Sequence, residues 1–135
     1  FFVRPLSARS STLFLNALPL WRRQPGRHSL DDLRHRLKDD DCIYIIYPEG
    51  TRSRDGRMCD FRPGIGMLVA GSSVPVIPCR ITGAFDAFPP DAKFPKPAPI
   101  AVRIGPPLTF ENTSNDKAGW AAAARNIERA VSDLA

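Results

Sequence analysis

Residues 42–46 form the run Cys-Ile-Tyr-Ile-Ile, which is almost wholly apolar and rich in β-branched side chains. A short run of this kind is typical of a strand buried inside a sheet. Pro48 ends it, because proline has no N–H to donate to the next rung of a ladder. Turn-forming glycine, serine and aspartate follow over residues 50–56. The sequence therefore predicts that Glu49 and Arg52 stand at the carboxyl edge of a sheet, where open α/β sheets bind ligands.

The residues before this run predict a helix that begins at Ser29. Asp31 and Asp32 occupy its first turn, where a helix dipole favours negative charge, and leucines recur on one face up to Leu37. An extended segment over residues 16–23 precedes the helix, and the apolar run follows it. A strand, a helix and a strand in this order form a β-α-β unit, which implies a parallel pair.

Farther along the chain, the pattern predicts a short buried helix that follows Pro63 and a second core strand interrupted by prolines. The expected later elements are a helix over residues 63–70, strands over 74–82 and 100–104, a long loop over 83–99 and a covering helix from about residue 116 to the end. At 135 residues the chain has the size of one domain. We expect a single domain over residues 1–135, of the α/β class, with a mostly parallel sheet and covering helices.

The composition favours an anionic partner and a reducing compartment. The formal net charge is +5, and most of the positive side is arginine. Cys42, Cys59 and Cys79 show no paired spacing, so buried free thiols are expected. No run is long enough for a transmembrane helix, and Phe1 is not an initiator residue. We expect that an amino-terminal part of the native protein, with any anchor it carries, lies before Phe1.

Four arginines lie within about a dozen residues behind the apolar run: Arg52, Arg54, Arg57 and Arg62. Planar guanidinium groups at this density suit a phosphate or a carboxylate. Two interpretations follow from the residues alone. The stretch is either a solvated, charged loop between a strand and a helix, or a seat for an anionic ligand.

Three blocks of sequence carry a resemblance to a known family. Residues 47–53 (Tyr-Pro-Glu-Gly-Thr-Arg-Ser), 61–64 (Phe-Arg-Pro-Gly) and 74–78 (Val-Pro-Val-Ile-Pro) resemble the third and fourth blocks of the glycerolipid acyltransferases, the family of 1-acylglycerol-3-phosphate acyltransferase. The resemblance covers roughly residues 1–110. It implies a glycerol-3-phosphate acyltransferase-like fold and acyl transfer to a lysophospholipid or a glycerol phosphate.

The resemblance also implies roles for individual residues. Residues 16–22 are similar to the family's Gly-x-x-Phe-x-x-Arg block, with Asn and Pro at the glycine and aromatic positions. Arg22 and Arg52 would then grip the phosphate of a lysophosphatidate-like acceptor, and Glu49 would orient those arginines or the glycerol. Gly50 and Thr51 would let the backbone approach closely, and residues 76–78 would shape the wall near the acyl donor. The alternative for Arg22 is a basic strand end that faces solvent.

The expected catalytic base is missing from the sequence. In this family a His-x-x-x-x-Asp block supplies it, and by family order that block would fall before Phe1. His35 and Asp40 have the same spacing, but they follow Arg22 and lie among polar residues, so the catalytic residues stay unassigned. The two histidines and scattered carboxylates give no metal-ligand spacing. No cofactor is expected, because acyl-CoA or acyl-carrier protein is the donor substrate.

We therefore expect an acyltransferase of phospholipid biosynthesis, at the cytoplasmic face of a membrane, either peripheral or anchored through the missing segment. The alternative is a non-catalytic phosphate- or lipid-binding relative that lacks the base. Nucleic-acid binding, a third possibility raised by the basic charge, is disfavoured, since the arginines cluster in loops with few aromatic side chains to stack bases.

Overall fold

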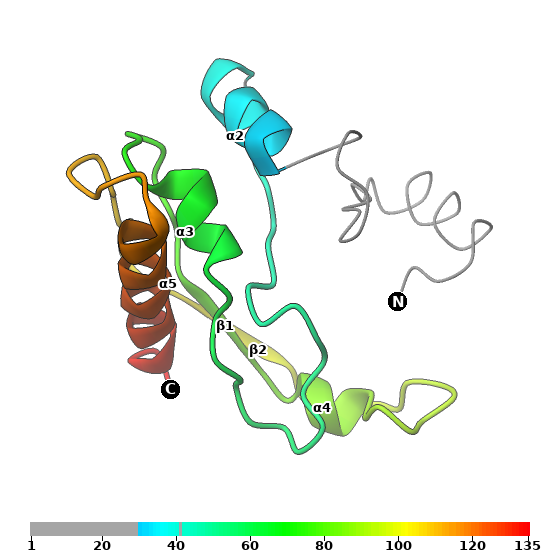
Figure 1. The fold of residues 1–135 in the computed structure, drawn as a ribbon. Coiled ribbons are helices and arrows are strands. Elements are labelled where there is room, and N and C mark those ends of the chain that lie inside the picture. The colour runs from blue at the N-terminus through cyan, green and yellow to red at the C-terminus, as the bar shows by residue number, and fades with distance from the viewer. Residues whose placement is uncertain (1–29, 41) are drawn as a thin grey trace.

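The computed structural model describes residues 30–40 and 42–135 (Figure 1). The elements within them are α2 (Leu30–Asp39), α3 (Gly64–Val69), β1 (Cys79–Thr82), α4 (Ala84–Ala87), β2 (Ala101–Ile104) and α5 (Lys117–Ser132). The three longer helices match the helices expected from the sequence. The expected segment over residues 16–23, with Arg22, lies outside the described residues.

Helices α3 and α5 lie side by side (Figure 1) and carry most of the hydrophobic core. Gly66 makes their close approach possible, because a Cβ atom added there would collide with the main-chain carbonyl of Trp120. The core between the helices consists of Leu33, Ile65, Leu68, Val69, Phe110, Ala123, Ala124, Ile127 and Val131. Asp116 caps α5, since its Oδ1 accepts a hydrogen bond from the N–H of Gly119 at 2.8 Å.

The side chain of Arg34 bonds helix α2 to the end of α3. Arg34 Nη1 donates to the carbonyl oxygen of Met67 at 2.7 Å and to Oδ1 of Asn115 at 2.9 Å, and its Nη2 donates to the carbonyl oxygen of Ala70. The last carbonyls of a helix have no partner inside the helix, so an arginine at this place satisfies them and complements the dipole.

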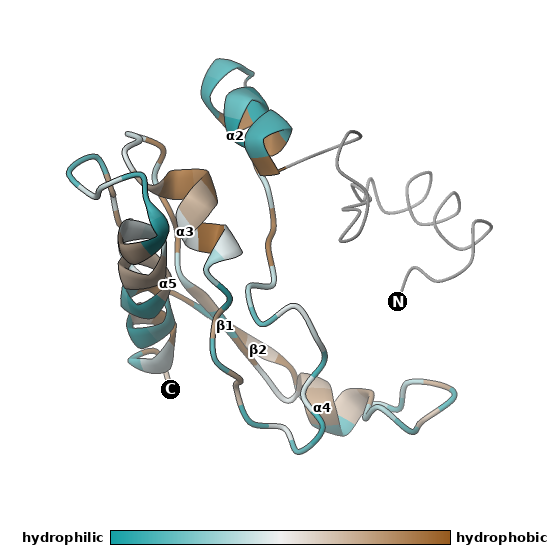
Figure 2. Cartoon of the chain, viewed as in Figure 1, coloured by the Kyte–Doolittle hydropathy of each residue, from teal (hydrophilic) through white to brown (hydrophobic). Residues whose placement is uncertain are grey.

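Strands β1 and β2 pair antiparallel, with Arg80 opposite Arg103 and Ile81 opposite Val102. The two arginines lie on the face turned toward α5, where they donate to the carbonyl oxygens of Ser132 and Leu134 at 3.4 and 3.1 Å. The other face is apolar and exposed. Ile81, Val102 and Ile104 lie on it, and Figure 2 shows brown, hydrophobic stretches in this pair of strands.

The prediction of a buried strand at residues 42–47 is wrong. This segment forms no regular strand and pairs with none among the described residues, and Ile43 and Ile45 are 93% and 84% exposed. Tyr44 alone packs against the core. The β-branched run dictates an extended backbone, whereas pairing requires a neighbouring strand. The one sheet in the described residues is antiparallel, so the expected parallel pair is not found there.

The prolines divide the strand expected over residues 74–82. Val76 forms an isolated antiparallel bridge with Leu108, and the regular strand starts only after Pro78, which has no N–H to donate. The long loop after β1 contains the single turn α4. The cysteines are free, as expected, but Cys59 and Cys79 are exposed, so the prediction of burial is wrong for both. Among the described helices, none is long and apolar enough to cross a membrane.

Candidate functional site

The turn-forming residues 47–62 fold into one closed loop, called the arginine loop below. Its base is made by backbone hydrogen bonds: Gly50 N–H donates to the carbonyl of Tyr47 at 3.0 Å, and Arg62 N–H donates to the carbonyl of Pro48 at 3.0 Å. Gly50 has a φ of 68°, a conformation that a residue with a side chain rarely adopts. The two ends of the loop are therefore held together.

Glu49 braces the interior of the arginine loop. Its Oε2 accepts a hydrogen bond from the N–H of Cys59 at 2.7 Å, and its carbonyl oxygen accepts one from Nε of Arg62 at 3.1 Å. Partial desolvation and the nearby Glu49 carboxylate raise the pKa of the Cys59 thiol. The raised pKa disfavours the thiolate form of Cys59.

The carboxyl side of the loop is tied to α5. Oε2 of Glu128 accepts a hydrogen bond from the N–H of Phe61 at 2.8 Å, across 67 residues of sequence. Phe61 also packs against the hydrophobic core. The loop therefore ends on the hydrophobic core and on α5.

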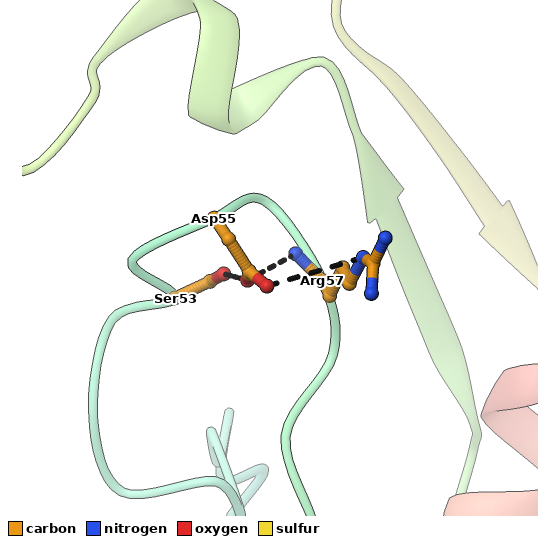
Figure 3. A network of polar contacts seen from close by, with 3 residues as sticks. All are labelled: Ser53, Asp55 and Arg57. Atoms are coloured by element: carbon orange, nitrogen blue, oxygen red, sulfur yellow. Dashed lines mark hydrogen bonds and ion pairs between the residues drawn. The ribbon is translucent and has the colours of Figure 1, made fainter.

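The outer turn of the loop is a small polar network (Figure 3). Oδ1 of Asp55 accepts hydrogen bonds from Ser53 Oγ at 3.1 Å and from Arg57 N–H at 3.0 Å, and Arg57 Nε lies 3.9 Å from Oδ2. The bond from the Arg57 N–H is the main cause that lowers the pKa of Asp55. Arg57 is 89% exposed at its side chain and Arg54 is also exposed. These two arginines face solvent.

Arg52 is placed differently from the other arginines. Its Nη2 donates to the carbonyl oxygen of Phe88 at 2.6 Å, and its Cζ lies 4.7 Å from the centre of the Phe88 ring. A cation at this distance over an aromatic face is attracted by the ring. The exposed guanidinium of Arg52 thus has a defined seat at the end of α4, whereas Arg54 and Arg57 belong to the outer turn.

Comparison with known proteins decides the family. The family model described as Acyltransferase matches residues 2–82, more than half of the chain. The chain belongs to the acyltransferase family. The matched region contains the arginine loop, α2, α3 and β1, and it ends before α4 and Phe88. No solved structure matches the chain.

Curated members of the acyltransferase family are similar over part of their length. A 1-acyl-sn-glycerol-3-phosphate acyltransferase of Limnanthes douglasii is 38% identical over 73 residues, which cover 54% of this chain and 26% of that protein. The chloroplastic enzyme BAT2 of the same name from Brassica napus is 32% identical over 90 residues, 65% of this chain and 26% of that protein. The alpha form from Mus musculus is 28% identical over 88 residues, which cover 64% of this chain and 31% of that protein. The chain thus spans about a quarter to a third of these relatives.

Of the site residues expected from the sequence, four lie in the described part of the chain. Glu49 and Gly50 are half-buried at the base of the loop, while Thr51 and Arg52 are exposed. The Glu49 carboxylate accepts a hydrogen bond from the N–H of Cys59, and the Glu49 carbonyl oxygen accepts one from Nε of Arg62. Because Arg22 lies outside the described residues, its convergence with Glu49 and Arg52 stays a prediction.

Sequence reasoning did not find two residues that shape the site, Phe88 and Glu128. Both contact the arginine loop from distant segments, and neither belongs to one of the three motif blocks. A signal for Phe88 was present in its position, since an aromatic residue in a long loop without periodicity needs a partner. Glu128 lies on the polar side of an amphipathic helix, where the pattern gives no sign of a specific contact.

The coincidental His35 and Asp40 pair does not lie at the arginine loop's tip. His35 belongs to α2, and Figure 1 shows α2 and α4 at opposite ends of the molecule. A general base must come within hydrogen-bond reach of the proton it removes. His35 is therefore not placed to act on a substrate bound at Arg52. The described residues also contain no group of three or more side chains able to hold a metal ion.

Proposed function

We propose that the protein transfers a fatty acyl group from acyl-CoA or acyl-carrier protein to a lysophospholipid or glycerol phosphate acceptor. Membership in the acyltransferase family supports this proposal. The names of the similar proteins, 1-acyl-sn-glycerol-3-phosphate acyltransferases, favour an acceptor of the lysophosphatidate type. No cofactor is needed, because the donor carries the activated acyl group.

The placement of Arg52 carries this proposal. The arginine loop is closed at its base, braced by Glu49 and tied to α5 by Glu128, so Arg52 is presented on a fixed support. A guanidinium binds a phosphate through two parallel N–H bonds, which requires a defined orientation. We propose that Arg52, assisted by Arg22, binds the acceptor phosphate, and that Gly50 and Thr51 let the acceptor approach the backbone.

The described residues contribute acceptor binding, and we propose that the base that removes the hydroxyl proton comes from another part of the protein. We further propose that the enzyme works at the cytoplasmic face of a membrane, where a lysophospholipid is reached. An exposed apolar sheet face supports such a contact: Ile81, Val102 and Ile104 are 45%, 56% and 69% exposed.

The test uses the complete protein, acyl-CoA and vesicles that contain one of two acceptors. Lysophosphatidate carries the phosphate, and monoacylglycerol is the matched acceptor without it. We expect formation of phosphatidate, with kcat/KM for lysophosphatidate at least about tenfold above that for monoacylglycerol, because a charge-assisted pair is lost with the phosphate. Equal use of both acceptors would contradict a phosphate seat. Phosphate-dependent vesicle binding without any product would favour the non-catalytic alternative.

A further inference from the structure

The seat of Arg52 is built by residues outside the matched family region. Phe88 provides both contacts, the carbonyl oxygen 2.6 Å from Nη2 and the ring 4.7 Å from Cζ. The two residues are 36 positions apart in the sequence. A long, exposed arginine side chain otherwise samples many rotamers, so two contacts from one residue restrict it strongly.

Phe88 is itself held in place. It caps α4, where its N–H donates to the carbonyl of Ala84 at 3.0 Å, and the N–H of Lys96 donates to the carbonyl of Ala87 at 2.8 Å. Ala87 is buried. Gly83 is the N-cap of α4, and a Cβ atom added there would collide with the carbonyl of Pro99. The support under Arg52 is thus fixed from both sides of α4.

A second contact joins α4 to the arginine loop. A Cβ atom added at Gly56 would lie only 3.3 Å from the ring of Phe85, so this ring lies against the outer turn. Gly56 has a φ of 81°, which favours glycine there. Phe85 and Phe88 therefore contact the loop at two points, at Gly56 and at Arg52.

We propose that Phe88 is a positioning residue that orients Arg52 for binding the acceptor phosphate. Arg52 can contact the Phe88 ring and a phosphate at the same time. The aromatic ring covers one face of the guanidinium, while oxygen acceptors bind the N–H groups in its plane. The ring attracts the cation but carries no net charge, so the positive charge of Arg52 stays available to the phosphate. A carboxylate partner would neutralise it. This inference rests on the function proposed above, and it adds a residue that no family block contains.

The experiment compares Phe88→Leu, Phe88→Tyr and Arg52→Ala in the complete protein. Leucine removes the π face but keeps apolar bulk and the main-chain carbonyl. We expect Phe88→Leu to raise KM for lysophosphatidate about two- to fivefold, the size of an exposed cation–π contact, with little change in kcat. Phe88→Tyr keeps the aromatic face and should have the wild-type KM. In the Arg52→Ala background, Phe88→Leu should add no further loss.

The controls separate the possible failures. Phe94→Leu is matched, because its ring lies in the same segment and is 82% exposed, and it should leave KM unchanged. An unchanged KM in Arg52→Ala would reject the phosphate role of Arg52. A raised KM in Arg52→Ala together with a wild-type KM in Phe88→Leu would reject the positioning role of Phe88 and leave the phosphate role of Arg52 intact. Parallel losses of kcat and thermal stability in both Phe88 variants would also overturn it, in favour of a structural role.

Discussion

Oε2 of Glu49 accepts a hydrogen bond from the N–H of Cys59 at 2.7 Å, and this bond joins the two sides of the arginine loop. Glu49 also lies in the motif block that suggested a substrate-orienting role. The bond gives Glu49 a defined structural role, because it sets the shape of the loop that carries Arg52.

Removal of the Glu49 carboxylate should therefore loosen the loop. In Glu49→Ala we expect the amide of Cys59 to exchange with solvent about tenfold faster, because a hydrogen bond to a charged group is lost. Glu49→Gln keeps an acceptor oxygen and should show a smaller effect. Hydrogen exchange resolved at single amides is the measurement, and an unchanged rate in Glu49→Ala would show that the bond does not restrain the loop.

Glu128 should matter for stability as well as for the loop. Glu128→Ala leaves the N–H of Phe61 without its acceptor in a partly buried position, which should lower the free energy of unfolding by about 1–3 kcal/mol. Arg125→Ala is the matched control on an exposed position of the same helix and should stay within about 0.5 kcal/mol of wild type. Denaturant titration of the three proteins compares them, and equal stabilities would contradict the assigned contact.

The contact between α3 and α5 predicts contrasting results for two glycines of one helix. Gly66→Ala places a Cβ against the carbonyl of Trp120 and should destabilise the protein by about 1–3 kcal/mol, as overpacking does. Gly64→Ala meets only Leu30 Cδ1 at 3.5 Å, an ordinary contact, and should be neutral or slightly stabilising. Thermal melting distinguishes the two. Similar melting temperatures would mean that the helices lie farther apart.

The cap of α5 predicts a pH dependence at acid pH. The hydrogen bond from the Gly119 N–H holds the pKa of Asp116 below its ordinary value of 3.8. A group with a depressed pKa stabilises the fold fully above the ordinary value, and this contribution is lost as pH falls through the lowered one. Asp116→Asn caps without titrating. We expect the melting temperature of wild type to fall relative to Asp116→Asn below pH 3.8, and parallel curves would contradict the cap.

Local patterns predicted the helices well. The leucine spacing and acidic first turn of α2, Pro63 before α3, and Asp116 before α5 all act within a few residues of the helix they start. Whether residues 42–47 pair with another strand could not be predicted in the same way. An extended backbone is a local property, whereas a ladder partner depends on where distant segments lie.

In the candidate site, too, the local features were predictable from the sequence and the long-range contacts were not. The motif block marked Glu49 and Arg52 as candidate site residues, and their roles toward a substrate stay predictions. The contacts that hold the loop were not readable, because Phe88 and Glu128 meet it across 36 and 67 residues. Such contacts follow from packing, which sequence spacing does not encode.

We propose that Arg52 binds the acceptor phosphate through its position and not merely through its charge. Arg52→Ala, Arg54→Ala and Arg57→Ala each remove one positive charge from the same loop, so a general basic field would make them equivalent. The decisive measurement is acyl transfer by the complete protein against acceptor concentration, at low salt and at about 0.15 M salt, where exposed charges are screened within about 8 Å.

We expect Arg52→Ala to raise KM for lysophosphatidate by roughly ten- to a hundredfold at both salt concentrations, as loss of a charge-assisted bidentate contact does. Arg54→Ala and Arg57→Ala should stay within about twofold of wild type at the higher salt, because both side chains face solvent. Equal losses in all three variants that fade together as salt is added would contradict the claim and would reduce the arginine loop to a basic surface.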